Sequence, residues 1–283
     1  MKFDIGKLFK ILTNKDESPF NIKLLEIAIE TDIVELVQLI YEKNDKLFKT
    51  EKDLYQLAFE KGSIKFLKWS KQNGITLPKN IIYCNIAAEF GHLECLQYAY
   101  ENDCPWNQET CDSAVLSGHL ECLKYAHQKG CPWNEDTCDS AVLSGHLECL
   151  KYARDNDCPW DEWTCQVAAY IGNLECLQYA HQNGCPWNEK TCIAAVNHGH
   201  LECLQYAHKN SCPWNKDTCA YAARNGNLEC LQYAHQNGCP WDEDTCYYAA
   251  SREYLECLRY ARENGCPWDD EIKALAVKIG YQE

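Results

Sequence analysis

Residues 91–117 read GHLECLQYAYENDCPWNQETCDSAVLS, and this stretch decides the fold. Close copies of it follow at intervals of 27 residues, beginning at Gly118, Gly145, Gly172, Gly199, Gly226 and Glu253. A fixed period of roughly 20 to 50 residues is typical of solenoids, in which each copy buries its apolar face only against neighbouring copies. We therefore expect one elongated array of structural repeats.

Each copy predicts two short helices joined by a turn. The residue after each repeated Trp is Asn or Asp, as at Asn134, and a short polar side chain there can accept hydrogen bonds from the free N–H groups of a helix start. Gly145 interrupts the pattern, and a second helix is expected from about Leu147. Pairs such as Asn183-Gly184 tolerate the left-handed backbone that often ends a helix.

The repeats become irregular at both ends of the chain. Residues 28–40 and 58–69 match residues 87–98 without the cysteines, and residues 269–280 match only a first helix. Lys273 stands where earlier copies have cysteine, and a charge there suits a capping helix whose outer face meets water. We expect nine helix pairs and a closing half. We divide the chain into an N-terminal cap segment (1–20), divergent repeats (21–80), regular repeats (81–268) and a C-terminal capping helix (269–283).

Residues 218–238, TCAYAARNGNLECLQYAHQNG, resemble the ankyrin repeat, and the resemblance extends in repeated form over residues 22–280. The period here is shorter than the 33 or so residues of an ankyrin unit. The missing residues fall where ankyrin repeats carry a β-hairpin finger, which Cys-Pro-Trp-Asn replaces here. The resemblance implies an all-α solenoid of stacked, ankyrin-like helix-turn-helix repeats without fingers.

The recurring motifs Leu-Glu-Cys-Leu and Gly-Cys-Pro-Trp are also similar to those of ankyrin-like arrays of large DNA viruses of amoebae and other protists. The family implies recognition of partner proteins without catalysis. In agreement, we find no Gly-rich phosphate loop and no nucleophile with a unique base partner, so we predict no catalytic residues and no cofactor.

The net charge of −15 is unevenly distributed: residues 81–283 hold 13 Lys/Arg against 30 Asp/Glu. Such a surface repels phosphate backbones and anionic lipids and favours basic protein surfaces. Charged residues interrupt any apolar signal core at the N-terminus, and we find no apolar run long enough to span a bilayer. We predict a cytoplasmic monomer, in the host cytoplasm if viral, with protein partners and neither nucleic-acid nor membrane partners.

Three cysteines recur in each regular copy, as at Cys138, Cys149 and Cys158, and the 21 in total suggest a metal site or disulfides. Equivalent residues of stacked helices lie about 8 to 10 Å apart, whereas a disulfide needs Cα atoms within about 7 Å. The best zinc candidate combines His127, Cys131 and Cys138. Because other copies have Tyr or Arg at the position of His127, we predict no metal and assign the thiols to the core. A metal- or redox-responsive scaffold is the alternative, and a purely structural spacer is a third.

Two other residue types recur with the repeat. The Trp residues from Trp106 to Trp268 and the Tyr residues from Tyr98 to Tyr260 form ladders, which we expect to pack between successive copies. Histidines at the Gly-His turn are expected to bond the turn backbone. They are His92, His119, His146 and His200, with Asn173 and Asn227 as substitutes.

Comparison of the copies with one another predicts where a partner binds. In the first helix of a copy, Cys192, Ala195 and Val196 recur and share one arc, which should face the core. The changing positions lie on the opposite arc. The predicted protein-binding residues on that arc are Asp112, Leu116, Asp139, Leu143, Gln166, Tyr170, Ile171, Ile193, Asn197, His198, Tyr221, Arg224, Asn225, Tyr247, Tyr248 and Arg252. Ser140, Val167, Ala194 and Ala220 occupy further outward positions.

Among these, Tyr170, Tyr221, Tyr248, Arg224 and Arg252 are the expected anchors, because Tyr and Arg dominate interface energetics. Neutral variation on a solvated face is the competing interpretation. It gives no reason for Ile171, Ile193 and two adjacent tyrosines on that face.

Overall fold

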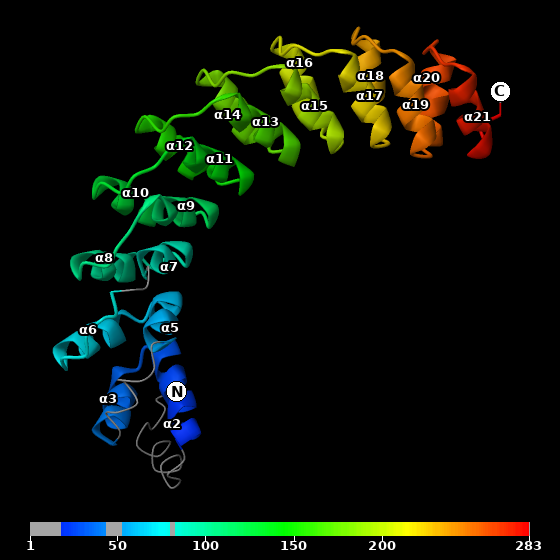
Figure 1. Ribbon diagram of the computed structural model, residues 1–283. Helices are drawn as coiled ribbons and strands as arrows, with labels where there is room; N and C mark the ends of the chain where they lie inside the picture. The colour runs from blue at the N-terminus through cyan, green and yellow to red at the C-terminus, as the bar shows by residue number, and fades with distance from the viewer. Residues whose placement is uncertain (1–17, 44–52, 80–82, 283) are drawn as a thin grey trace, which may run out of the picture. The chain divides into compact units, whose positions relative to one another are not determined.

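The computed structural model describes residues 18–43, 53–79 and 83–282, and these contain helices and no strand. Within these ranges nine helix pairs are followed by a single helix, α21. Figure 1 labels these helices along the chain. This confirms the predicted all-α solenoid of helix pairs without β-hairpin fingers. Most of the proposed N-terminal cap segment, residues 1–17, lies outside the described residues.

The first helices of the pairs are α2 Ser18–Glu30, α5 Asp53–Lys61, α7 Tyr83–Glu89, α9 Gln108–Leu116, α11 Glu135–Leu143, α13 Glu162–Ile171, α15 Glu189–Asn197, α17 Lys216–Arg224 and α19 Glu243–Ser251. The closing helix α21 spans Asp270–Lys278. The second helices are α3 Val34–Lys43, α6 Ile64–Gln72, α8 Leu93–Glu101, α10 Leu120–Gln128, α12 Leu147–Asp155, α14 Leu174–Gln182, α16 Leu201–Lys209, α18 Leu228–Gln236 and α20 Leu255–Glu263.

The chain divides into two units, Met1–Trp133 and Asn134–Glu283. In each unit the first helices pack side by side in one layer and the second helices in another. In the second unit α13, α15, α17 and α19 are successive neighbours, as are α14, α16, α18 and α20. The first unit repeats this order with α5, α7 and α9 in one layer and α6, α8 and α10 in the other.

The expected helix starts are present. Asn134, Asp161, Asn188, Asn215 and Asp242 accept a hydrogen bond from the backbone N–H two residues ahead. These bonds satisfy one of the donors that a helix start leaves free. One polar residue therefore fixes the start of each of these five first helices, whereas the Asn107 side chain makes no such bond at the start of α9.

The core arc of the first helices is also placed as predicted. Cys192, Ala195 and Val196 of α15 are fully buried, and so are the equivalent residues of α17, Cys219, Ala222 and Ala223. Small apolar side chains on this arc let neighbouring helices approach closely. The remaining arc of each first helix is then free to differ between copies.

The aromatic ladders join successive copies. The His181 ring stacks on Trp187 with ring centroids 3.7 Å apart, and its Nδ1 lies 3.0 Å from the hydroxyl of Tyr206 in the next copy. Tyr206 also meets Trp187 edge to face, with ring centroids 6.2 Å apart. The predicted packing role of the Trp and Tyr ladders is thus seen directly.

The same column explains why His, Tyr and Arg alternate at the position of His181. Tyr100 stacks on Trp106 at 4.2 Å between centroids, and the Arg154 guanidinium carbon lies 4.4 Å from the centroid of the Trp160 ring. All three side chains end in a flat group that can lie on an indole. The position therefore selects for shape and tolerates a change of charge.

Candidate protein-binding surface

The third cysteine of each copy makes a specific backbone contact. The Cys185 thiol lies 3.1 Å from the carbonyl oxygen of Asp161, which is the N-cap residue of the preceding first helix. The same contact is made by Cys131, Cys158, Cys212, Cys239 and Cys266, at 3.0 to 3.2 Å. A thiol is a weak donor, and here it adds a contact between copies to a carbonyl that already accepts the backbone N–H of Thr164. Sequence reasoning treated these residues only as filler.

All 21 cysteines are buried as free thiols. Burial raises the pKa of Cys149, Cys176 and Cys203 to about 11, so these groups are protonated near neutral pH. Among the described residues, no three His, Cys, Asp or Glu side chains are placed to share a metal ion. The repeat equivalent of the zinc candidate contains His181, whose ring is engaged by Trp187 and Tyr206.

The side chains at the Gly-His turn bond to backbone atoms in two ways. His92 Nε2 lies 3.0 Å from the carbonyl oxygen of Glu60, and Asn227 Nδ2 donates to the carbonyl oxygen of Val196 at 2.7 Å. Both acceptors belong to the preceding copy, whereas Asn173 Oδ1 accepts from the backbone N–H of Cys176 in its own copy at 2.9 Å. The His200 ring covers Gly172, a glycine of the preceding copy with φ of +76°. These side chains therefore fasten one turn to the next.

Residues of the predicted surface gather in two pockets of the second unit. One has a volume of about 380 Å³ and is called here the arginine pocket. It is lined by Asn197, His198, Tyr221, Arg224, Asn225, Arg252 and Tyr254. The guanidinium carbon of Arg224 lies 5.5 Å from the ring centroid of Tyr221 and 5.6 Å from that of Tyr248, which holds this cation between two phenols.

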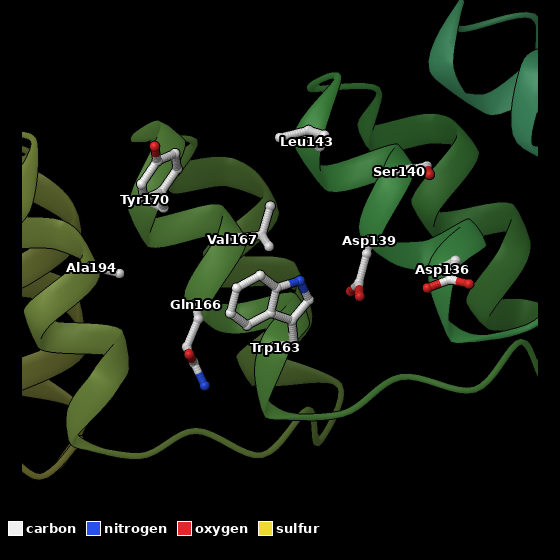
Figure 2. A pocket seen from close by; sticks show the side chains of 9 residues that line it. All are labelled: Asp136, Asp139, Ser140, Leu143, Trp163, Gln166, Val167, Tyr170 and Ala194. Atoms are coloured by element: carbon white, nitrogen blue, oxygen red, sulfur yellow. The ribbon is translucent and has the colours of Figure 1, made fainter.

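The other pocket has a volume of about 530 Å³ and is called here the tryptophan pocket. Figure 2 shows its lining: Asp136, Asp139, Ser140 and Leu143 from α11, Trp163, Gln166, Val167 and Tyr170 from α13, and Ala194 from α15. Tyr170 also meets His198 of the arginine pocket edge to face, with ring centroids 4.2 Å apart. The two pockets are therefore neighbours on one surface.

Asp139 is the most perturbed carboxylate of this surface. Thr164 donates its hydroxyl to Asp139 Oδ1 at 2.6 Å. The pKa of Asp139 is raised to about 6, chiefly by burial and also by the negative charges of Asp161, Asp136 and Glu135, against the opposing effect of the Thr164 bond. This carboxylate is thus held in place in a strongly acidic environment.

The other predicted residues lie outside the two pockets. Ile171 and Ile193 are half-buried, and Tyr247 is exposed with its ring centroid 5.5 Å from that of Tyr248. In the first unit Leu116 is exposed, and Asp112 accepts a hydrogen bond from Gln108 at 3.3 Å. The sequence did not predict that the outward residues of the first helices would group into two pockets.

Some outward positions were wrongly predicted. Gln166 and Val167 are 8% exposed and Ala220 is 3% exposed. The helical angle gives the direction of a side chain, but these positions are covered because neighbouring first helices pack closely. Gln166 and Val167 nevertheless line the tryptophan pocket as part of its wall.

Three pocket residues were missed in the sequence: Asp136, Trp163 and Tyr254. Trp163 is 56% exposed. Equivalent positions in other copies hold Glu109, Asp136, Lys190, Asp217 and Asp244. A Trp at a position otherwise always charged was the signal that could have found it.

No helix of the described residues combines the length and the apolar character needed to cross a bilayer. No protein-family model matches the sequence, and no curated protein matches it. Among solved structures, the chain is similar to the human ASB11 ankyrin repeat domain, with 15% sequence identity and a TM-score of 0.49. That match covers 61% of this chain and 98% of the other.

Proposed function

We propose that this protein is a non-enzymatic scaffold that binds a partner protein through the changing face of its first helices in the second unit. One observation carries the proposal: the positions that differ between copies line two adjacent pockets, while the positions that recur are buried in the core. Recurrent positions build the array and changing positions supply a surface that differs from copy to copy. Such a division suits recognition of one partner.

The chemistry of the surface supports a protein partner. It presents exposed Tyr170 and Tyr247, the exposed Arg252, and Arg224 held between two tyrosines. Tyr and Arg are the side chains that most often dominate protein interfaces, because they combine large contact area with directional polar groups. The proposal assigns no catalytic role to the described residues of this surface.

The test is affinity capture from a cell extract with the intact chain and with a variant carrying Tyr221→Ala, Arg224→Ala, Tyr248→Ala and Arg252→Ala. The matched control carries Glu175→Ala, Glu202→Ala and Glu229→Ala on exposed positions of the second helices. We expect a partner that both the intact chain and the control capture and that the four-residue variant loses. Equal capture by all three proteins would contradict the proposed surface.

We further propose that the helix pairs are ankyrin-like units of 27 residues and that the chain acts in a cytoplasm as a monomer, as a viral adaptor within a host cell. The turn and helix sequence of residues 218–238, the reduced cysteines and the acidic array support these assignments. Cell fractionation, light scattering and the identity of the neighbouring genes test location, oligomeric state and origin separately.

A further inference from the structure

Trp163 has no packing role of the kind that explains the other repeated Trp residues. The ladder Trp residues lie at the end of each copy and stack on the residue six positions earlier, as Trp187 does on His181. Trp163 lies in the first turn of α13, is 56% exposed, and makes no ring contact with another aromatic side chain of the described residues. A large exposed indole in a pocket is a feature of binding sites.

The charged residues that line this pocket are both acidic. Asp136 and Asp139 line the same pocket, and the charged groups acting on Asp139 are Asp161, Asp136 and Glu135. Among the described residues, no Lys or Arg forms an ion pair with Asp136 or Asp139. Figure 2 shows the Asp139 carboxylate projecting from α11 on the side where Trp163 lies. The pocket therefore combines an aromatic face with carboxylates that lack a cation.

A polar group in the wall is also left without a partner. Gln166 is 8% exposed and lines the pocket, and no hydrogen bond joins its carboxamide to another described residue. The Gln166 carboxamide is not among the buried polar groups that lack a partner, so solvent reaches its atoms and a ligand could bond to them. Its carbonyl oxygen is an acceptor, as are the free lone pairs of the two carboxylates.

We propose that the tryptophan pocket binds an arginine side chain of the partner protein. This inference rests on the proposed function and names the chemistry that the surface recognises. A guanidinium is planar, so it can lie on the Trp163 indole while its N–H groups donate to Asp139 and Asp136. Arginine fits better than lysine because lysine offers a compact charge without a flat face. The excess of acidic residues in the array attracts such a partner.

The test uses the full chain and small probes, so it needs no identified partner. The indole N–H signal of Trp163 is followed by NMR while Nα-acetyl-arginine methylamide is added, and the signal is assigned by its loss in Trp163→Lys. This variant copies Lys190, the residue of the next copy at the same position. The control probe is the citrulline analogue, which has nearly the same shape and no charge.

We expect the arginine probe to shift the Trp163 signal in a saturable manner and the citrulline probe to bind at least about tenfold more weakly. Asp139→Asn should weaken the arginine probe about tenfold as well. This variant keeps an acceptor for Thr164, because Asn85 accepts from Thr110 at the same position in an earlier copy. Its matched control is Asp112→Asn, which removes the equivalent charge in a copy that lacks the exposed Trp.

Equal binding of the two probes, or equal effects of Asp139→Asn and Asp112→Asn, would overturn the inference. If the arginine probe fails to bind while partner capture still depends on the arginine pocket, this inference falls and the proposed function stands. If the arginine probe binds selectively while every first-helix variant captures as much partner as the intact chain, the proposed function is wrong and the pocket assignment stands.

Discussion

At the residue scale, two glycines with similar backbone conformations have different surroundings. Gly172 and Gly184 both have a positive φ, +76° and +84°. A Cβ added at Gly172 would lie 2.5 Å from His200 Nδ1, whereas a Cβ at Gly184 would meet nothing within 4 Å. The first glycine is required by a neighbour and by its backbone, and the second by its backbone alone.

We therefore expect Gly184→Ala to lower the free energy of unfolding by about 1 kcal/mol, because only backbone strain is added. Gly172→Ala should lower it by about 1 to 3 kcal/mol more, because the methyl group displaces the His200 ring from the turn of the preceding copy. Urea denaturation followed by circular dichroism measures both values. Equal losses would show that the His200 contact contributes nothing.

Asp139 should weaken the fold at neutral pH. Its pKa in the folded protein is raised to about 6 from an ordinary value of 3.8, chiefly by burial. The folded protein holds the proton more tightly than the unfolded chain, so stability falls as the pH rises from about 4 to about 6 and stays lower above that. Asp139 thus has an unfavourable ionised state that a bound cation would relieve.

Asp139→Asn should accordingly be more stable than the natural protein at pH 7 and nearly equal to it at about pH 3, where the carboxyl group is largely neutral in both states. Thermal melting of both proteins across this range measures the difference. A difference that does not change with pH would contradict the raised pKa.

At the element scale, the His residues that stack on the ladder Trp residues should make the stability of the fold depend on pH. Burial lowers the pKa of His181 below its ordinary value of 6.5. The folded protein therefore binds this proton less tightly than the unfolded chain, and stability is lost as the pH falls through about 6.5. His127 and His235 have pKa values lowered by the same cause.

His181→Arg should reduce this loss. Arginine occupies the same position at Arg154 and Arg262, where the guanidinium carbon lies 4.4 Å and 4.0 Å from the Trp ring centroid. Arg is protonated in both the folded and the unfolded state, so it contributes no pH dependence in this range. The melting temperature of the variant, relative to the natural protein, should rise as the pH falls from about 7.5 to about 5.5. A constant difference would rule out His181 as a source of the acid sensitivity.

The helix pairs could be predicted from the sequence because the same helix-start and turn residues recur in many copies. An N-cap such as Asn188 and a glycine such as Gly199 mark the start of a helix and the turn after it in each copy. One misleading residue therefore changes the prediction little. The pockets could not be predicted in this way. They depend on how closely α11, α13 and α15 pack, which decides that Gln166 is covered and Trp163 is not. Spacing along one helix contains no information about that distance.

At the scale of the whole molecule, the 21 buried thiols distinguish a structural array from a thiol-based sensor. A thiol reacts as its thiolate, and burial raises the pKa of thiols such as Cys149 and Cys203 to about 11. Reaction of these thiols in the folded state should therefore wait for local or global unfolding.

We expect a disulfide reagent such as Ellman's reagent to label the native protein slowly, and to label all 21 thiols quickly in denaturant. Absorbance of the released thiolate gives both the rate and the number of reacted groups. A chelator should leave the melting temperature unchanged. Several thiols that react within seconds in the native protein, or a melting temperature that falls on chelation, would instead support the metal- or redox-responsive alternative.

The thiol of each third cysteine reaches back to a carbonyl 24 residues earlier, as from Cys212 to Asn188 and from Cys239 to Asn215. Because both halves of this joint are the same in neighbouring copies, unequal recombination that removes or adds one 27-residue copy recreates an intact joint at the new boundary. A gene built this way can change its number of copies without a damaged intermediate, and each added copy brings a new first-helix face on which selection can act.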